Sequence, residues 1–133
     1  AAKKAFATMG EVAGDAMATA VTLIDGLIVI GGGITAASKY IKPALMQELR
    51  SQMRTISGET FDRVQMKVYD LDNEEEFEAF AKGASRELKV YGTDKSVTYD
   101  PQKRIGVMIS KIGASTAISL GAYAFALNEI DKK

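Results

Sequence analysis

The spacing of apolar residues along the chain distinguishes its predicted helices from its predicted strands. Between residues 3 and 23 apolar side chains recur every three or four positions, which predicts a helix with one buried face. Leu27 to Ile30 form an unbroken apolar run, which predicts a strand buried on both faces in a parallel sheet. Gly31, Gly32 and Gly33 follow directly. The chain therefore begins with a predicted helix, a buried strand and a glycine turn.

A second helix and a second strand are predicted next. The helix is capped by Thr35 or Ser38 and ends near Arg54, and residues 56–63 follow as a loop. Residues 64–69 alternate between apolar and polar side chains, which predicts a strand covered on one face only and near the sheet edge. The inward positions of the helix are Ile41, Leu45, Met46 and Leu49.

A third helix and an inserted hairpin are predicted after that strand. Asp72 or Asn73 caps the helix, and Gly83 ends it. Its inner side carries Phe77, Phe80 and Ala81. Residues 84–104 are interpreted as an insertion, because two alternating stretches flank a Gly-Thr-Asp-Lys turn at 92–95.

The chain ends with a predicted strand and a long helix. Ile105 to Ile109 predict a second buried strand, and residues 114–131 predict a helix. Because large apolar side chains occur on most sides of this helix, we expect it to be buried nearly all round. The succession of helices and strands predicts an α/β fold in which residues 1–133 form a single lobe.

Composition narrows the possible functions. The chain has 133 residues, the size of one domain, and its 17 basic and 17 acidic residues cancel. This balance gives no reason to expect nucleic acid or an anionic membrane as a partner. The sequence contains no cysteine and no histidine, which removes thiolate chemistry, the commonest general base and the commonest metal ligand. Because the chain begins with Ala-Ala-Lys-Lys and no methionine, we expect it to be a piece of a longer protein.

The glycine triplet is the main candidate site. The carboxyl edge of an open α/β sheet is where such sheets bind ligands, and glycine lets a ligand approach the backbone closely. A following helix that points its amino end at this edge would favour an anion. A tight turn that lets the helix pack against the strand explains the same three glycines. The triplet matches neither the P-loop nor the dinucleotide-binding fingerprint.

Other stretches leave alternatives open. The last helix carries a stripe of small residues, which suits close approach of another backbone or of a flat ligand ring, and equally suits ordinary helix packing. Ser115 and Thr116 could contact a phosphate or cap this helix. The acidic run from Asp70 to Glu78 is interpreted as a capped helix start on a solvated face, with a metal site as the alternative. The stripe consists of Ala114, Ala117, Gly121 and Ala124.

Two segments of the chain resemble a known family. Residues 23–34 read Leu-Ile-Asp-Gly-Leu-Ile-Val-Ile-Gly-Gly-Gly-Ile, and residues 113–126 read Gly-Ala-Ser-Thr-Ala-Ile-Ser-Leu-Gly-Ala-Tyr-Ala-Phe-Ala. Together they resemble the carboxyl-terminal end of ROK-family sugar kinases, which are glucokinase-like, and of the related repressors. The resemblance covers the first third and the last fifth of the chain. The middle departs from compact members, above all at the hairpin of residues 84–104.

The resemblance implies a fold and an activity. The fold is a partial ribonuclease-H-like lobe of the actin-like ATPase type, with an inserted β-hairpin. The activity is ATP-dependent phosphorylation of a hexose such as glucose, with Mg²⁺, by a cytoplasmic homo-oligomer without membrane contact. By the same resemblance Gly31, Gly32, Gly33 and Ile34 bind the nucleotide, and the last helix packs beside it.

Several family motifs have no counterpart in this sequence. These are the Asp-x-Gly phosphate motif, the catalytic aspartate, the Glu-x-Gly-His sugar motif and the cysteine-rich zinc motif. We therefore expect no catalytic residue and no metal ligand in this chain, which would need the amino-terminal lobe of the same protein as its partner and would not catalyse alone. Two alternatives remain: the end of a sugar-responsive repressor that binds nucleic acid through an upstream module, and a non-enzymatic structural module.

Overall fold

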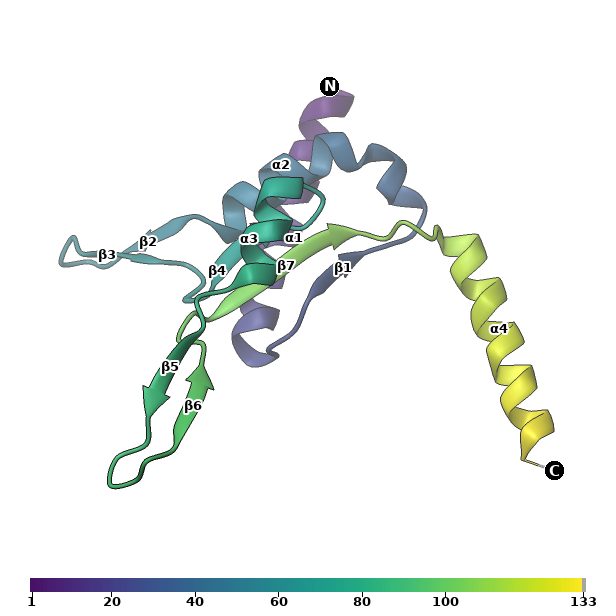
Figure 1. Ribbon diagram of the computed structural model, residues 1–133. Coiled ribbons are helices and arrows are strands. Elements are labelled where there is room, and N and C mark those ends of the chain that lie inside the picture. Colours follow the sequence, from purple (N-terminus) through teal and green to yellow (C-terminus); the bar gives the residue numbers. More distant parts are fainter. Residues whose placement is uncertain (133) are drawn as a thin grey trace.

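The computed structural model describes residues 1–132 and confirms a mixed α/β fold (Figure 1). Residues 1–132 contain a three-stranded parallel sheet, two antiparallel hairpins, four α-helices and a short 3-10 helix. The elements are α1 (Ala2–Leu23), β1 (Ile28–Ile30), the 3-10 helix η1 (Gly33–Ala37), α2 (Ser38–Leu49), β2 (Gln52–Arg54), β3 (Thr60–Asp62), β4 (Lys67–Asp70), α3 (Glu74–Lys82), β5 (Arg86–Lys89), β6 (Ser96–Tyr99), β7 (Arg104–Ile109) and α4 (Ala114–Asp131).

The parallel sheet has the strand order β1-β7-β4, so the last strand of the sequence lies in the centre. Ile28 pairs with Val107 on one side, and Val68 pairs with Ile105 on the other. Ile105 and Val107 are only 1% and 0% exposed, which confirms the prediction of a buried strand there. Because all three strands run in the same direction, their carboxyl ends meet at one edge.

One face of this sheet is covered by α1 and α2, which pack against each other. Their contact is close because Gly10 and Gly14 of α1 face α2. A Cβ atom at Gly10 would overlap the carbonyl oxygen of Ile41, and one at Gly14 would lie 2.7 Å from Cβ of Glu48. No sequence motif marks these two glycines. The core comprises Ala18, Val21, Leu45, Met46, Leu49, Val64, Val68, Ile105 and Val107.

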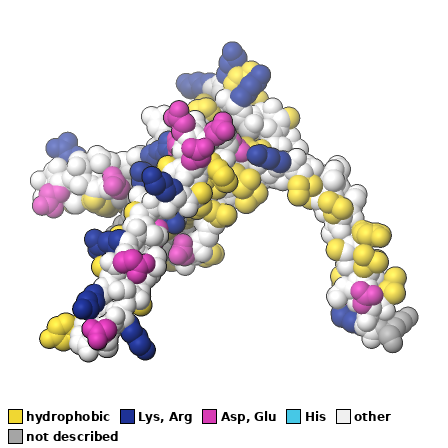
Figure 2. Space-filling view, in the orientation of Figure 1, with side chains coloured by type: hydrophobic (Ala, Val, Ile, Leu, Met, Phe, Trp, Pro, Cys, Tyr) yellow, Lys and Arg dark blue, Asp and Glu magenta, His cyan; other side chains and the backbone are white. Residues whose placement is uncertain are grey.

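The exposed side chains of α4 and β1 correct two expectations. Every residue of α4 from Ala114 to Asp131 is exposed, whereas burial nearly all round was expected. Figure 1 shows α4 extending away from the sheet, and Figure 2 shows hydrophobic side chains along it. Leu27 and Val29 are each 56% exposed, so the prediction that this strand is buried on both faces is also wrong. Both residues are thus more than half exposed within residues 1–132.

Helix ends and caps differ from the predictions at several positions. Helix α2 ends at Leu49 rather than near Arg54. Its N-cap is Ala37, so neither Thr35 nor Ser38 caps it, and Thr35 Oγ1 donates instead to the Gly32 carbonyl. Asn73 does cap α3, accepting a hydrogen bond from the Glu76 N–H at 3.0 Å. Phe80 of α3 stacks edge-on against Tyr69, whereas Phe77 and Ala81, expected on the inner side, are exposed.

The strands of the middle region also need correction. Residues 56–63 were expected to form a loop, but Thr60–Asp62 form β3, which pairs with β2. Strand β4 lies at the sheet edge as predicted, but it begins at Lys67, and Tyr69 on its supposedly open face is only 4% exposed. Phe80 covers Tyr69, so both faces of β4 are covered.

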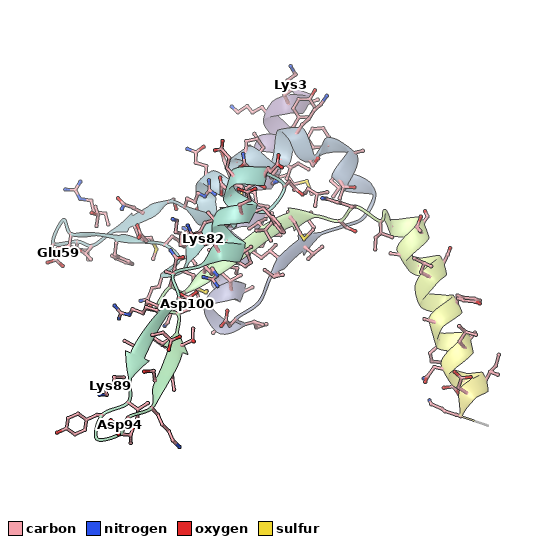
Figure 3. All side chains as sticks on the ribbon, viewed as in Figure 1. Lys3, Glu59, Lys82, Lys89, Asp94 and Asp100 are labelled. Atoms are coloured by element: carbon pink, nitrogen blue, oxygen red, sulfur yellow. The ribbon has the colours of Figure 1, made fainter. Side chains whose placement is uncertain are left out.

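The predicted hairpin at residues 84–104 is present as β5 and β6, with Leu88 opposite Val97. Asp100 ties its base to the body, because its carboxylate accepts hydrogen bonds from Arg104 Nη1 at 2.6 Å and from the Ala84 N–H at 3.2 Å. Figure 3 shows Asp100 at the base of the hairpin and Asp94 at its far end.

The free edge of β4 is closed by two side chains. Arg50 donates to the Val68 carbonyl at 3.0 Å, and the Glu76 carboxylate accepts the Asp70 N–H at 2.7 Å. Arg50 and Glu76 also form an ion pair with each other. These groups occupy the positions where the backbone of a further strand would bind.

Among residues 1–132, none of the helices combines the length and the apolar character that a membrane-spanning segment needs.

Candidate functional site

The glycine triplet lies at the carboxyl edge of the sheet, directly after β1, as expected. Gly32 adopts a φ of 94°, which side-chain-bearing residues rarely adopt. Gly33 begins η1, so a short 3-10 helix, and not an α-helix, follows the strand. Ile34 in this helix is 40% exposed. All four residues that the family resemblance predicts to bind a nucleotide are therefore adjacent and at least partly accessible.

The turn after β7 lies beside these glycines. The Ser110 N–H donates to the Ile30 carbonyl at 2.8 Å, and a Cβ at Gly31 would lie 3.8 Å from Cβ of Ser110. Residues 110–113 then lead into α4 through Gly113, which has a φ of 77°. Parallel pairing of β1 with β7 thus brings together two glycine-containing turns that are some 80 residues apart in the sequence.

The space around these glycines is empty. A Cβ at Gly32, Gly33 or Gly113 would meet no atom within 4 Å, and the same holds for Gly121 on the small-residue stripe of α4. The stripe is therefore open rather than packed against a helix of residues 1–132. Ser115 and Thr116 do not cap α4, because Gly113 is its N-cap and no side chain binds there.

Two aspartates and a lysine near this edge contact one another, and the sequence did not predict this contact. Lys42 of α2 donates to Oδ2 of Asp72 at 2.6 Å and also binds Asp70. A cleft of about 750 Å³ lies over these groups, and Ile109 contributes to its lining. Asp70 and Asp72 are 28 and 30 residues from Lys42, so no local pattern indicates the cluster.

The acidic run at residues 70–78 is divided among separate partners. Asp70 and Asp72 bind Lys42, and Glu76 binds Arg50. In the part of the chain that the structure describes, no three acidic side chains converge on a point where a metal ion could sit. The capped helix start explains Asn73 and the acids of the first turn of α3.

Loss of the Lys42 cluster at high pH is expected to reduce stability. Burial alone lowers the pKa of Lys42, but hydrogen bonds to Asp70 and Asp72 and their charges outweigh it, so the pKa lies above its ordinary value of 10.5. A cationic group with a raised pKa stabilises the fold below the ordinary value and loses this effect as pH rises through the raised one. We expect the stability difference between wild type and Lys42→Met to be constant from about pH 7 to 9 and to shrink above 10.5.

Urea denaturation at a series of pH values measures this difference. Lys89→Met is the matched control, because Lys89 is 72% exposed and its Nζ lies 3.9 Å from Asp94. A difference between wild type and Lys42→Met that persists undiminished into strongly alkaline solution would contradict the prediction.

Comparison with known proteins provides one informative match. The chain is similar to a glucokinase from Parabacteroides distasonis of known crystal structure, with 53% sequence identity and a TM-score of 0.80. The match covers 96% of this chain and 34% of that glucokinase, so the chain spans about a third of its length. No family model matches the chain, and no curated protein matches it. The expected resemblance to a glucokinase-like sugar kinase is confirmed.

Proposed function

We propose that this chain is the nucleotide-side, carboxyl-terminal part of an ATP-dependent sugar kinase of the ROK family, which phosphorylates a hexose such as glucose. Its sheet and helices are then part of a ribonuclease-H-like lobe of the actin-like ATPase type. Similarity to a glucokinase at 53% identity favours this function over a sugar-responsive repressor. It also favours a kinase over a purely structural module.

The observation that carries the proposal is the empty space at the glycine triplet. Gly31 and Gly33 have no positive φ, and no atom lies closer than 3.8 Å to a Cβ added at either. Neither the backbone conformation nor packing within residues 1–132 therefore requires glycine at these two positions. Close approach of a ligand to the backbone does explain them. The tight-turn alternative explains only Gly32.

We assign Gly31, Gly32, Gly33 and Ile34 to the nucleotide, with the small-residue stripe of α4 beside it. The sugar hydroxyl needs a carboxylate to accept its proton during phosphoryl transfer. Asp70 and Asp72 near this edge are bound by Lys42, so neither is a free base. The catalytic aspartate, and the groups that hold Mg²⁺ and the terminal phosphates, are assigned to the amino-terminal lobe.

The same lobe is the proposed cover for the exposed apolar surfaces. Leu27 directly before β1 and Val29 within it are each 56% exposed, and the apolar side chains of α4 are also exposed within residues 1–132. Those of α4 include Ile118, Leu120, Phe125, Leu127 and Ile130. Several large apolar side chains exposed on one element, as on α4, are typical of an interaction site.

The experiment that tests the function uses a protein of glucokinase length that contains this chain. Two or three hydrogen bonds to ATP, at about 1.5–3 kcal/mol each, must offset an ordering cost of at least about 4 kcal/mol. The chain alone is therefore expected to bind ATP with a Kd of about 1 mM or weaker. In the longer protein, Gly32→Val is expected to weaken ATP binding about tenfold, measured by isothermal titration calorimetry.

Gly58→Val provides the matched control. Gly58 has the same φ of 94° but lies between β2 and β3, so valine is equally strained there and far in sequence from the glycine triplet. We expect Gly58→Val to retain wild-type affinity for ATP. If Gly32→Val and wild type bound ATP with equal affinity, the glycine triplet would not be part of the nucleotide site.

A further inference from the structure

Asp72 completes the hydrogen bonding of β7 at the point where β4 has ended. The last backbone bond between these two segments runs from the Leu71 N–H to the Val107 carbonyl at 2.9 Å. The chain then turns into α3, and the Ile109 N–H donates to Oδ2 of Asp72 at 3.0 Å. A side chain thus takes the place of the missing strand neighbour.

Lys42 fixes this carboxylate in turn. Its Nζ donates to Oδ2 of Asp72 at 2.6 Å and binds Asp70 as well, and the Asp72 N–H donates to Oδ1 of Asp70 at 2.9 Å. The Lys42 side chain is only 13% exposed, and those of Asp70 and Asp72 are 24% and 26% exposed. Because these groups are partly buried, salt screens their interaction less than it screens a fully exposed ion pair. The position of Asp72 is therefore set by both α2 and the end of β4.

These contacts act directly before the turn that meets the glycine triplet. The Ile109 N–H is bound to Asp72 on one side of β7, and the N–H of Ser110 is bound to the Ile30 carbonyl on the other. Gly31 lies beside Ser110, with 3.8 Å between an added Cβ and Cβ of Ser110. A shift at Ile109 would therefore move residues 110–113 relative to the glycines.

We propose that Asp72, held by Lys42, is a positioning residue for the nucleotide site, because it sets where β7 ends and hence how the turn at residues 110–113 faces Gly31 to Gly33. This inference rests on the proposed function. Asp72 binds the backbone of β7 and needs no contact with the nucleotide. Its loss should therefore weaken ATP binding in the ground state and the transition state alike, which raises the KM for ATP and leaves kcat and the KM for sugar unchanged.

The test compares Asp72→Ala with Asp72→Asn in the kinase of glucokinase length. Asp72→Ala is expected to raise the KM for ATP about tenfold, since it removes a hydrogen bond to a charged group. Asparagine keeps an acceptor for the Ile109 N–H and should restore most of the affinity. Asp94→Ala is the control, because Asp94 is a fully exposed carboxylate at the far end of the β5–β6 hairpin (Figure 3) and should leave all three constants unchanged.

Hydrogen exchange of the Ile109 amide provides a second readout, which does not depend on ATP. Its protection should be lost in Asp72→Ala and kept in Asp72→Asn. If Ile109 loses protection while ATP binds as tightly as before, the inference is wrong and the proposed function stands. If the wild-type protein binds no ATP, the proposed function fails and the inference fails with it.

Should Asp72→Ala not fold, Lys42→Met and Asp72→Asn carry the test. Lys42→Met leaves the acceptor in place but releases it from α2, so it should raise the KM for ATP more than Asp72→Asn does. A KM for ATP that is unchanged in Lys42→Met would overturn the role assigned to Lys42.

Discussion

Gly10→Val is expected to lower the free energy of unfolding by about 2–3 kcal/mol, the upper part of the range for overpacked positions. A Cβ at Gly10 would overlap the carbonyl oxygen of Ile41 and would lie 3.1 Å from Cβ of Ala44. The backbone of α2 cannot rotate away as a flexible side chain could. The two helices would have to separate, which would also loosen the Phe6–Tyr40 stack, whose ring centroids are 6.2 Å apart. Urea denaturation followed by circular dichroism measures the change.

Gly121→Val is the matched control for this prediction. Gly121 is also a glycine inside an α-helix, but a Cβ there meets no atom within 4 Å. We expect its effect to stay within about 0.5 kcal/mol, as for other surface substitutions. Equal midpoints for Gly10→Val and wild type would show that α1 and α2 are not in close backbone contact.

Leu45→Ala is expected to destabilise the chain by about 3 kcal/mol, within the range for leucine deletions in cores. Leu45 is 1% exposed and belongs to the cluster that joins α1 and α2 to the sheet. Removing its side chain loses apolar burial and leaves a cavity between Val68 and Ile105 on the sheet and Val21 on α1, which are members of the same cluster. Equilibrium unfolding in urea gives the free-energy change.

The same substitution in α4, Leu120→Ala, tests whether the loss of stability comes from core packing or from replacing leucine as such. Leu120 is 55% exposed, so its replacement should change the stability of the chain alone by no more than about 0.5 kcal/mol. If the amino-terminal lobe covers α4, the same substitution becomes destabilising in the longer protein. An equally small effect in both proteins would contradict that cover.

Local sequence patterns predicted where the helices and strands lie more accurately than they predicted what those elements pack against. The first helix was placed at residues 3–23 and occupies Ala2–Leu23, and the last was placed at 114–131 and occupies Ala114–Asp131. Hydrophobic periodicity belongs to a single element, so it can be recognised in the sequence without knowing what that element packs against. The pattern says that the side chains of α4 and of Val29 are suited to burial, but it does not say which partner buries them. Both were predicted to be buried and are exposed here.

Elements without such a pattern were missed. Strands β2 and β3 have only three residues each, Gln-Met-Arg and Thr-Phe-Asp, so each holds a single apolar side chain and the alternation is too short to indicate this hairpin. Gly10 and Gly14 lie in a helical pattern as small residues, and only the position of α2 explains them.

The candidate site was predicted in part. The glycines follow β1 as expected, because a strand that ends in glycine is a local feature. The Asp72 contacts with Lys42 and with the Ile109 N–H span 30 and 37 residues, so they arise from the fold and carry no local signature. Asp72 was predicted to be a helix cap, a role that Asn73 performs, or part of an acidic run on a solvated face with a metal site as the alternative.

The closed edge of β4 limits how copies of this chain can assemble. Fibre growth by strand addition needs two open edges on each sheet, because each copy must pair with one neighbour on either side. Arg50 and Glu76 block the edge beyond β4, so among residues 1–132 the edge of β1 is the single place where the parallel sheet can be extended. Copies that pair through this sheet therefore stop at two, edge to edge about a two-fold axis, and cannot propagate into a filament.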